Sequence, residues 1–212
     1  MTVLYDVMTK ILPTLDIEQS LWSQGKKIIC GIDEVGRGCF AGPVVVGAVI
    51  FPDNVVLPDG LADSKLLTPI KRLELDPIIK QLAVAWAIEE TSVEIINKVG
   101  IGQATQIAFY NVVQKLEQPP EHILIDAFYI NAIPHEIQSP VVNGDKTCAS
   151  IAAASVIAKV YRDNLMIDLD EKYPEYGFAV HKGYGTKRHQ EAIKTHGLTP
   201  LHRTSFNLGK FM

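Results

Sequence analysis

The chain has 212 residues, of which 47% are hydrophobic and 21% charged, so it can bury the core of one domain without disulfides. Its net charge of −4 argues against a protein that coats nucleic acid with its whole surface. The three cysteines are widely spaced, and neither a long apolar run nor a secretory signal pattern is present, which argues against a disulfide scaffold, a structural zinc site and a membrane protein. We therefore expect one cytoplasmic domain over residues 1–212.

Hydrophobic periodicity and capping residues predict the elements of an α/β domain. In chain order they are a helix at 15–22, strands at 28–33 and 44–51, a helix at 68–81, a strand at 83–90, helices at 92–98 and 102–116, strands at 122–126 and 139–143, and helices at 147–171 and 187–196. Pro77 is expected to break or kink its helix, with Asp76 capping the part that follows. Cys148 is expected to be a small buried residue on the long helix. The order predicts a mixed five-stranded sheet flanked by helices.

Basic residues gather at the C-terminal end of the chain. Residues 181–212 contain six Lys or Arg and one Glu, a net charge of +5, and four of the six histidines. Such a segment can contact a phosphate backbone, or it can form an ordinary solvated face. Phe206 can anchor this tail by packing.

Four carboxylates lie at the expected ends of elements. Asp33 and Glu34 follow the first strand, Asp126 ends the fourth, and Asp145 precedes the long helix. Ends of this kind meet at one edge of an α/β sheet, although each acid alone can equally be a cap or turn residue. Asp33 and Glu34 can share a site only if the strand ends at Asp33, because neighbours in a strand point to opposite faces.

Carboxylates gathered in this way repel one another unless a cation neutralises them. Oxygen-only ligands favour Mg²⁺ or Mn²⁺, and two such ions can act on the attacking water and the leaving oxygen of a phosphodiester. The carboxylates therefore indicate metal-assisted phosphoryl chemistry.

The segments around these acids resemble a known family. They are GIDEVGRGCFAGPVVVGAVI, LADSKLL, LIDA, NGDKTCASIAAASVIAKVYRD, HKGYGTKRH and TPLHRTSF. Their order and spacing are similar to those of type 2 ribonucleases H (ribonuclease HII), over about residues 28–206. The resemblance implies a ribonuclease H-like fold with a helical C-terminal extension.

The resemblance also implies an activity and a metal site. Asp33, Glu34, Asp126 and Asp145 match the four carboxylates that hold two Mg²⁺ or Mn²⁺ ions in the family. The implied enzyme is a metal-dependent endonuclease that hydrolyses the RNA strand of RNA–DNA hybrids. It is also implied to cut 5′ of single ribonucleotides in duplex DNA, leaving 5′-phosphate and 3′-hydroxyl ends. We expect a monomer, and no sequence pattern indicates a protein partner such as a replication clamp.

Five further residues match substrate contacts of the family. Gly36, Arg37 and Gly38 match the bend that reads the 2′-hydroxyl and the phosphates at an RNA–DNA junction. Tyr184 matches the tyrosine that stacks on the sugar after the scissile ribonucleotide, and Lys65 matches a phosphate contact. Glycines suit this task because they allow close backbone approach, and the 2′-hydroxyl is what separates RNA from DNA.

The sequence departs from the family pattern at three places. Asn143 stands where lysine is usual, Ala127 where glycine is common, and Cys39-Phe40 where a proline-containing pair is usual. None removes a carboxylate, so we expect them to affect metal affinity or junction fit and not the reaction class.

Two alternative functions remain. The first is a non-catalytic protein that binds RNA–DNA junctions, which the intact quartet disfavours because four unneutralised acids repel a phosphate backbone. The second is a nuclease of related fold, such as a junction resolvase, which would not need the glycine-rich bend or Tyr184.

Overall fold

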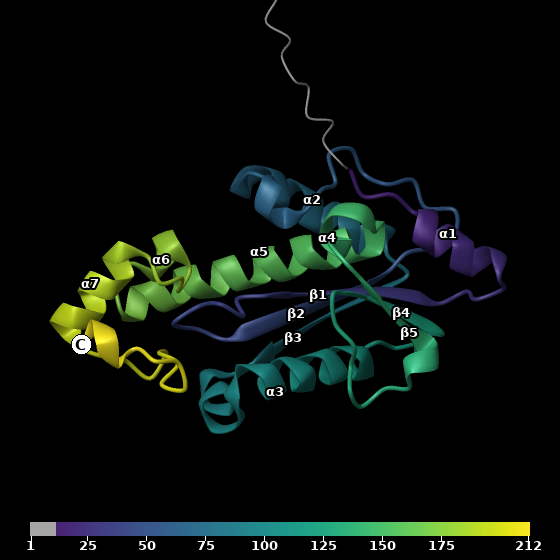
Figure 1. The fold of residues 1–212 in the computed structure, drawn as a ribbon. Coiled ribbons are helices and arrows are strands. Elements are labelled where there is room, and N and C mark those ends of the chain that lie inside the picture. The colour runs from purple at the N-terminus through teal and green to yellow at the C-terminus, as the bar shows by residue number, and fades with distance from the viewer. Residues whose placement is uncertain (1–11) are drawn as a thin grey trace, which may run out of the picture.

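The computed structural model describes residues 12–212, which are built around one mixed five-stranded sheet (Figure 1). Its strands are β1 (Ile29–Val35), β2 (Val44–Ile50), β3 (Ala85–Thr91), β4 (His122–Asp126) and β5 (Gln138–Val141). In space the order is β3-β2-β1-β4-β5. The pairs β1–β2 and β2–β3 are antiparallel, whereas β1–β4 and β4–β5 are parallel. The predicted mixed sheet is confirmed.

Helices cover both faces of this sheet (Figure 1). On one face lie α5 (Ala149–Lys172) and α2 (Pro69–Leu82), and on the other lies α3 (Val93–Gln114). The remaining helices are α1 (Asp16–Ser23), α4 (Gly144–Thr147), α6 (Phe178–His181) and α7 (Lys187–His196), with short 3₁₀ turns η1 (Ser64–Leu66), η2 (His135–Ile137) and η3 (Gly209–Phe211). Within residues 12–212, no helix is long and apolar enough to cross a membrane.

The long helix α5 lies unusually close to the sheet. A Cβ added to Gly31 of β1 would lie 2.3 Å from the carbonyl carbon of Ser150, and one added to Gly47 of β2 would lie 2.4 Å from the Ala154 carbonyl oxygen. Glycine in the sheet and alanine or serine in the helix therefore allow the close packing. This places α5 directly beside the end of β1.

Helix α2 continues through Pro77, so the predicted break is wrong. Proline deprives the carbonyl four residues earlier of its usual donor. That carbonyl belongs to Leu73, which lies on the exposed side of the helix, where water can replace the lost donor. Asp76 does not cap a second segment either, because its carboxylate pairs with Lys80 at 2.8 Å within the same helix.

Two other expected helices form one element with a kink. The sequence predicts separate helices at 92–98 and 102–116. In the structure α3 covers both segments and is kinked at Gly100, which has a φ of 79°. The long helix was expected from residue 147, but it begins at Ala149. The residue before it, Cys148, is extended and separates α5 from the single turn of α4. Cys148 is buried as predicted, but it precedes the helix.

The predicted helical C-terminal extension is confirmed. Helices α6 and α7 pack around Tyr176, Phe178 and Ile193, at the end of the molecule far from α1 (Figure 1). Phe206 is only half-buried, and the tail is anchored instead by fully buried side chains such as Arg203 and Leu208.

Candidate active site

Three of the predicted carboxylates line one pocket at the carboxyl ends of two parallel strands. The pairing of β1 with β4 ends at Ile32 and Ile125, so the next residues, Asp33 and Asp126, are the first beyond the paired region. Together with Glu34 they line a pocket of about 530 Å³. The sheet edge therefore brings together acids that are more than 90 residues apart in the sequence.

Glu34 reaches this pocket although β1 does not end at Asp33. The pairing of β1 with β2 continues to Val35, so the predicted strand end is wrong. The prediction of a shared site is nevertheless consistent with the geometry, because β1 loses only its β4 neighbour after Ile32. The open side lets the backbone N–H of Glu34 donate to Oδ1 of Asp33 at 2.8 Å.

Burial and mutual repulsion make these acids hard to ionise. Burial, followed by the charge of Glu34, raises the pKa of Asp33 to about 8. Burial likewise raises the pKa of Glu34 to about 7, against the opposing effect of Arg37. The pKa of Asp126 is also raised, chiefly by burial. Burial, more than a shortage of nearby cations, therefore disfavours the ionised forms of these acids, since Arg37 and Lys65 also line the pocket.

The fourth carboxylate, Asp145, is linked to the pocket through Lys65. Asp145 lies on α4, and its Oδ2 accepts a hydrogen bond from Nζ of Lys65 at 2.9 Å. Lys65 lines the pocket. Oδ1 of Asp126 accepts a hydrogen bond from the backbone N–H of Gly144 at 2.8 Å, which ties α4 to the end of β4. Burial alone would lower the pKa of Lys65, but the hydrogen bond and charge of Asp145 raise it.

The donor set fits a hard divalent cation. All four candidate ligands are carboxylates, whose oxygens suit Mg²⁺ or Mn²⁺ better than Zn²⁺. A cation bound between the buried acids would also favour their ionised forms. Within residues 12–212, no three acidic, histidine or cysteine side chains already surround one point, and the carboxylate of Asp145 is turned to Lys65. An ion shared with Asp145 would therefore compete with Lys65 for this carboxylate.

The two glycines of the glycine-rich bend serve different purposes, although both line the pocket. Gly36 has a φ of 89°, and a Cβ there would lie 2.0 Å from Nε of Arg162, so the fold itself requires glycine. A Cβ on Gly38 would meet nothing within 4 Å. Between them, the guanidinium of Arg37 lies 4.6 Å from the ring centroid of Phe128. On the pocket side, the bend therefore leaves open space at Gly38 and places the Arg37 guanidinium against the Phe128 ring.

Tyr184 lines the same pocket from a loop after α6. Its side chain is 41% exposed, and Nζ of Lys159 lies 5.7 Å from its ring centroid. The backbone of the loop is fixed: the N–H of Tyr184 donates to the carbonyl of His181 at 2.9 Å, and Nδ1 of His189 lies 2.9 Å from the carbonyl oxygen of Tyr184. An aromatic face is therefore held at the rim of the pocket.

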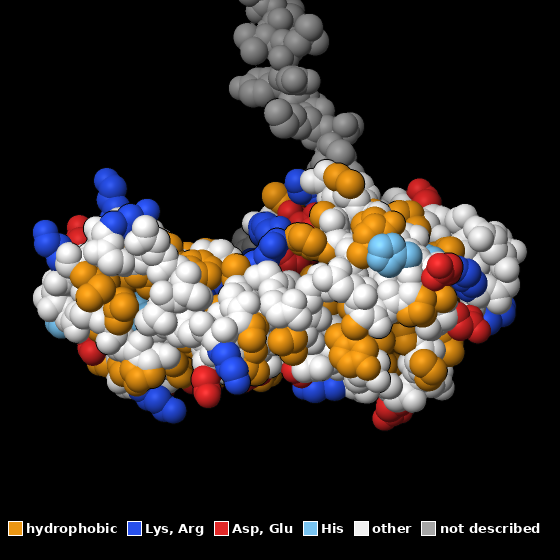
Figure 2. All heavy atoms as spheres, turned by 60° about the horizontal axis from the view of Figure 1, so that its bottom comes forward, with side chains coloured by type: hydrophobic (Ala, Val, Ile, Leu, Met, Phe, Trp, Pro, Cys, Tyr) orange, Lys and Arg blue, Asp and Glu red, His pale blue; other side chains and the backbone are white. Residues whose placement is uncertain are grey.

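Four polar residues that the sequence did not single out also line the pocket: Ser64, Arg72, Ser155 and Lys159. The hydroxyls of Ser64 and Ser155 lie 2.8 Å apart, and Ser155 lowers the pKa of Asp33 by a hydrogen bond that partly offsets its burial. No local pattern distinguishes these serines from the other small residues of their segments. Figure 2 shows basic and acidic side chains meeting at the edge of a hollow between the lobe of α6 and α7 and the rest of the molecule.

Two buried arginines hold the loops that frame the site. Arg162 donates to the carbonyl oxygens of Pro43 at 3.0 Å and Lys182 at 2.9 Å. Arg203 donates to the carbonyl oxygen of Arg37 at 2.8 Å. The sequence contained both arginines in matching motifs, YRD and HRTSF, but gave no indication that their role is to bind backbone carbonyls.

Two of the departures from the family pattern have a backbone explanation. Ala127 and Asn143 have φ angles of 57° and 55°, in the left-handed region that favours glycine and tolerates asparagine. Glycine is thus the less strained residue at position 127. At the third departure, the thiol of Cys39 is buried and lies 3.6 Å from the carbonyl oxygen of Lys182, while the N–H of Phe40 donates to the carbonyl of Gly183 at 2.9 Å.

Comparison with known proteins identifies the family. The family model described as Ribonuclease HII matches residues 30–208. A ribonuclease HII of Roseiflexus castenholzii is 48% identical over 198 residues, which cover 92% of this chain and 88% of the relative. That of Geobacillus kaustophilus is 51% identical over 190 residues, or 89% of this chain and 72% of the relative.

Solved structures share the same fold. Ribonuclease H2 of Pyrococcus horikoshii OT3 matches with a TM-score of 0.73 and 24% identity, over 86% of this chain and 95% of that one. The RNase HII in a PCNA complex from Archaeoglobus fulgidus matches with a TM-score of 0.69 and 25% identity, over 85% and 95%. The expected ribonuclease H-like architecture is therefore confirmed. The chain belongs to the ribonuclease HII family, and it is an endoribonuclease of the ribonuclease H class.

Proposed function

We propose that this enzyme hydrolyses the RNA strand of RNA–DNA hybrids and cuts duplex DNA 5′ of a single embedded ribonucleotide, leaving 5′-phosphate and 3′-hydroxyl ends. The observation that carries the proposal is that the acids Asp33, Glu34 and Asp126 share one pocket with the bend 36–38 and Tyr184. The acids proposed to act in phosphodiester hydrolysis thus lie in the same pocket as residues suited to contact a sugar. One 2′-hydroxyl is all that distinguishes the embedded ribonucleotide from its neighbours.

The proposed metal site consists of Asp33, Glu34, Asp126 and Asp145, holding two Mg²⁺ or Mn²⁺ ions. Bound ions of this kind would activate water and stabilise the leaving oxygen. The chain supplies the oxygen donors and a buried setting that strengthens their attraction for a cation. Lys65 holds Asp145 in this structure, and its side chain, which is 72% exposed, can instead contact a phosphate.

The substrate contacts are proposed to come from both sides of the acids. Arg37 and its glycines would bind the junction, with Gly38 leaving room for the nucleic-acid backbone. Tyr184 would stack on the sugar that follows the scissile ribonucleotide, since its ring is exposed at the rim. Two arguments disfavour the alternatives. Clustered acids would weaken the binding of nucleic acid by a non-catalytic protein, and a junction resolvase would not need the glycine-rich bend or Tyr184.

Three features stay predictions from the sequence. They are a single catalytic domain over residues 1–212, a monomeric state and a cytoplasmic location. Size-exclusion chromatography with light scattering tests the second of these directly.

The proposed activity can be tested with two labelled substrates, a hybrid with an all-RNA strand and a DNA duplex with one ribonucleotide. We expect both to be cut with Mg²⁺ or Mn²⁺ and neither with EDTA, with products that carry 5′-phosphates. Tyr184→Ala should lose on the order of 1 to 3 kcal/mol of binding on the single-ribonucleotide duplex, and Tyr184→Phe should retain it. If Tyr184→Ala cuts this duplex as well as the wild type does, the proposed stacking role is wrong.

A further inference from the structure

A second groove begins where the carboxylate pocket ends. It has a volume of about 390 Å³ and shares Arg72, Lys159 and Tyr184 with that pocket. Its other walls come from the start of α2, from Asp163 of α5, and from the end of α6 with the loop that follows it. A strand that passes Tyr184 on leaving the carboxylates therefore has a continuous path into this groove.

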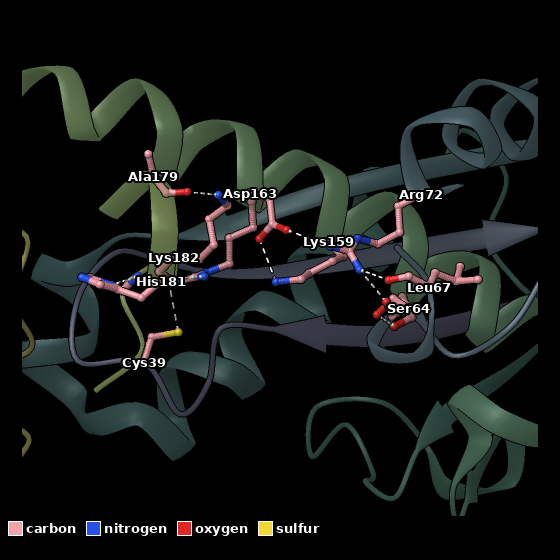
Figure 3. Close-up of polar contacts among 12 residues, drawn as sticks. Cys39, Ser64, Leu67, Arg72, Lys159, Asp163, Ala179, His181 and Lys182 are labelled. Atoms are coloured by element: carbon pink, nitrogen blue, oxygen red, sulfur yellow. Dashed lines mark hydrogen bonds and ion pairs between the residues drawn. The ribbon is translucent and has the colours of Figure 1, made fainter. Parts of the chain in front are cut away.

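Two of the cations in the groove are held in place by one carboxylate. Oδ1 of Asp163 accepts a hydrogen bond from Nζ of Lys159 at 2.7 Å, and its Oδ2 lies 3.5 Å from Nη2 of Arg72. Arg72 also donates through Nη1 to the carbonyl oxygens of Ser64 at 2.8 Å and Leu67 at 2.6 Å. The interior side of the groove is thus a fixed basic surface, with Asp163 as its positioning residue (Figure 3).

Lys182 adds a third cation that is held less firmly. Figure 3 shows its side chain pointing toward Ala179 near Asp163, and its Nζ donates to the carbonyl oxygen of Ala179. No described carboxylate lies within ion-pair distance of this ammonium. Burial and the neighbouring charge of Lys159 lower its pKa, against the opposing effect of Asp163.

The backbone at Lys182 is also strained. Its φ is 52°, in the left-handed region that costs a residue with a side chain roughly 1 to 2 kcal/mol relative to glycine. Lys182 directly follows α6, where a left-handed residue commonly ends a helix, so glycine would suit this backbone. The residues that line the groove carry three cations, Arg72, Lys159 and Lys182, and one acid, Asp163. The net charge of the lining is therefore positive, and it suits an anion.

We propose that this groove is a phosphate subsite for the substrate strand beyond Tyr184, with Lys182 as its direct contact and Lys159 as the cation between that phosphate and the tyrosine ring. The proposal rests on the proposed function, since it assigns the anion to the backbone of the same nucleic acid. It adds a point of attachment away from the scissile bond, so it acts on binding and not on the chemical step.

The test uses Lys182→Gly, because this change removes the cation and relieves the strained backbone, so the fold should not suffer. The matched control is Lys98→Asn, which removes the same charge from an exposed position on α3. Binding of a duplex with one ribonucleotide is measured without divalent ions, by fluorescence anisotropy, between 50 and 200 mM salt. Kd increases as the salt concentration increases, and each phosphate contact contributes a factor of about 3.5 to this increase between 50 and 200 mM. Loss of one contact should therefore make the increase in Kd about 3.5-fold smaller.

We expect this reduction for Lys182→Gly and not for Lys98→Asn. With Mg²⁺ present, Lys182→Gly should raise KM and leave kcat within about twofold. A duplex truncated one nucleotide beyond the ribonucleotide should bind both variants equally, because its backbone does not reach the groove.

Two results would overturn the proposal. One is an unchanged salt dependence for Lys182→Gly on the long duplex, together with normal cleavage by the wild type, which would leave the proposed function standing. The other is binding of inorganic phosphate that Lys182→Gly abolishes without any loss of duplex affinity, which would make the groove a site for a small anion. Failure of the wild type to cleave would count against the proposed function itself.

Discussion

Nζ of Lys65 lies 2.9 Å from Oδ2 of Asp145, and this bond joins η1 to α4 across 80 residues of sequence. The Asp145 side chain is 5% exposed and that of Lys65 is 72% exposed. The exposed Lys65 side chain can therefore swing away from the buried carboxylate. Asp163 has the opposite arrangement, because both of its cations, Arg72 and Lys159, are largely buried. Asp163 pairs with these two residues from α2 and α5. The two aspartates therefore have different roles.

Exchanging each of these aspartates for asparagine should separate the roles. Asp145→Asn removes a proposed metal ligand and should lower kcat at least about a hundredfold, or roughly 3 kcal/mol. Asp163→Asn leaves two largely buried cations without their acid and should cost about 3 kcal/mol of stability, with kcat retained within several-fold. Steady-state kinetics at saturating substrate and urea denaturation measure both quantities. A larger loss of kcat for Asp163→Asn than for Asp145→Asn would contradict the assignment.

Ala127→Gly should stabilise the enzyme. Ala127 has a φ of 57°, where alanine is strained and glycine is not, so the exchange should gain about 0.5 to 1 kcal/mol after the entropy of the unfolded glycine is counted. The matched control is Ala132→Gly, at an exposed position without a positive φ, which should lose about the same amount. Thermal denaturation of both variants checks the signs, and a destabilising Ala127→Gly would show that strain at this turn is not the reason for the usual glycine.

Gly36 and Gly38 should respond differently to added side chains. Gly36→Ala drives a Cβ into Arg162 at a positive φ, so we expect a loss of several kcal/mol in stability. Gly38→Val meets open space in the free enzyme and should unfold at nearly the wild-type temperature. It should nevertheless bind the single-ribonucleotide duplex much more weakly, since the side chain occupies the room left for the substrate. Normal affinity of Gly38→Val would remove this glycine from the substrate site.

The buried histidines should make stability depend on pH. Nε2 of His189 lies 3.1 Å from Nε2 of His202, and burial lowers the pKa of each to about 4. In the unfolded chain their pKa is about 6.5. Below about pH 6.5 the unfolded state therefore binds protons at these histidines, whereas the folded state does not bind them until the pH approaches 4. Stability contributed by the neutral histidines is therefore lost as the pH falls from about 7 toward 4.

His202→Gln isolates this contribution. The raised pKa values of Asp33 and Glu34 act in the opposite direction over the same pH range, but they are common to both proteins. The stability advantage of the wild type over His202→Gln should therefore shrink by about 2 kcal/mol between about pH 7.5 and pH 5. Urea denaturation at both pH values measures the difference, and an advantage that does not change with pH would contradict neutral burial of His202.

The sequence predicted the sheet because each strand has its own local pattern, and Asp126 does end β4 as expected. The route by which Glu34 joins Asp33 was not predictable, because it depends on where the β1–β4 pairing stops, and that register is set between segments 90 residues apart. The partners of Asp163 come from α2 and α5, and their packing angle has no local signature. Helix α2 continued through Pro77 because tertiary contacts outweigh the lost hydrogen bond.

We propose that the carboxylates act through bound divalent ions, and Asp126→Asn tests this role most directly. Asparagine keeps an oxygen to accept the hydrogen bond that Asp126 takes from the Gly144 N–H, so the turn of α4 should stay in place. The change removes a charge that burial already disfavours. The variant should therefore unfold at or above the wild-type temperature without metal.

The measurement is single-turnover cleavage of a duplex with one ribonucleotide, by wild type and Asp126→Asn, over a titration of Mg²⁺. We expect the wild-type rate to rise with Mg²⁺ and to disappear with EDTA, and Asp126→Asn to be slower by at least about a hundredfold even at saturating Mg²⁺. Near wild-type cleavage by Asp126→Asn at saturating Mg²⁺, or wild-type cleavage that persists in EDTA, would contradict this proposal.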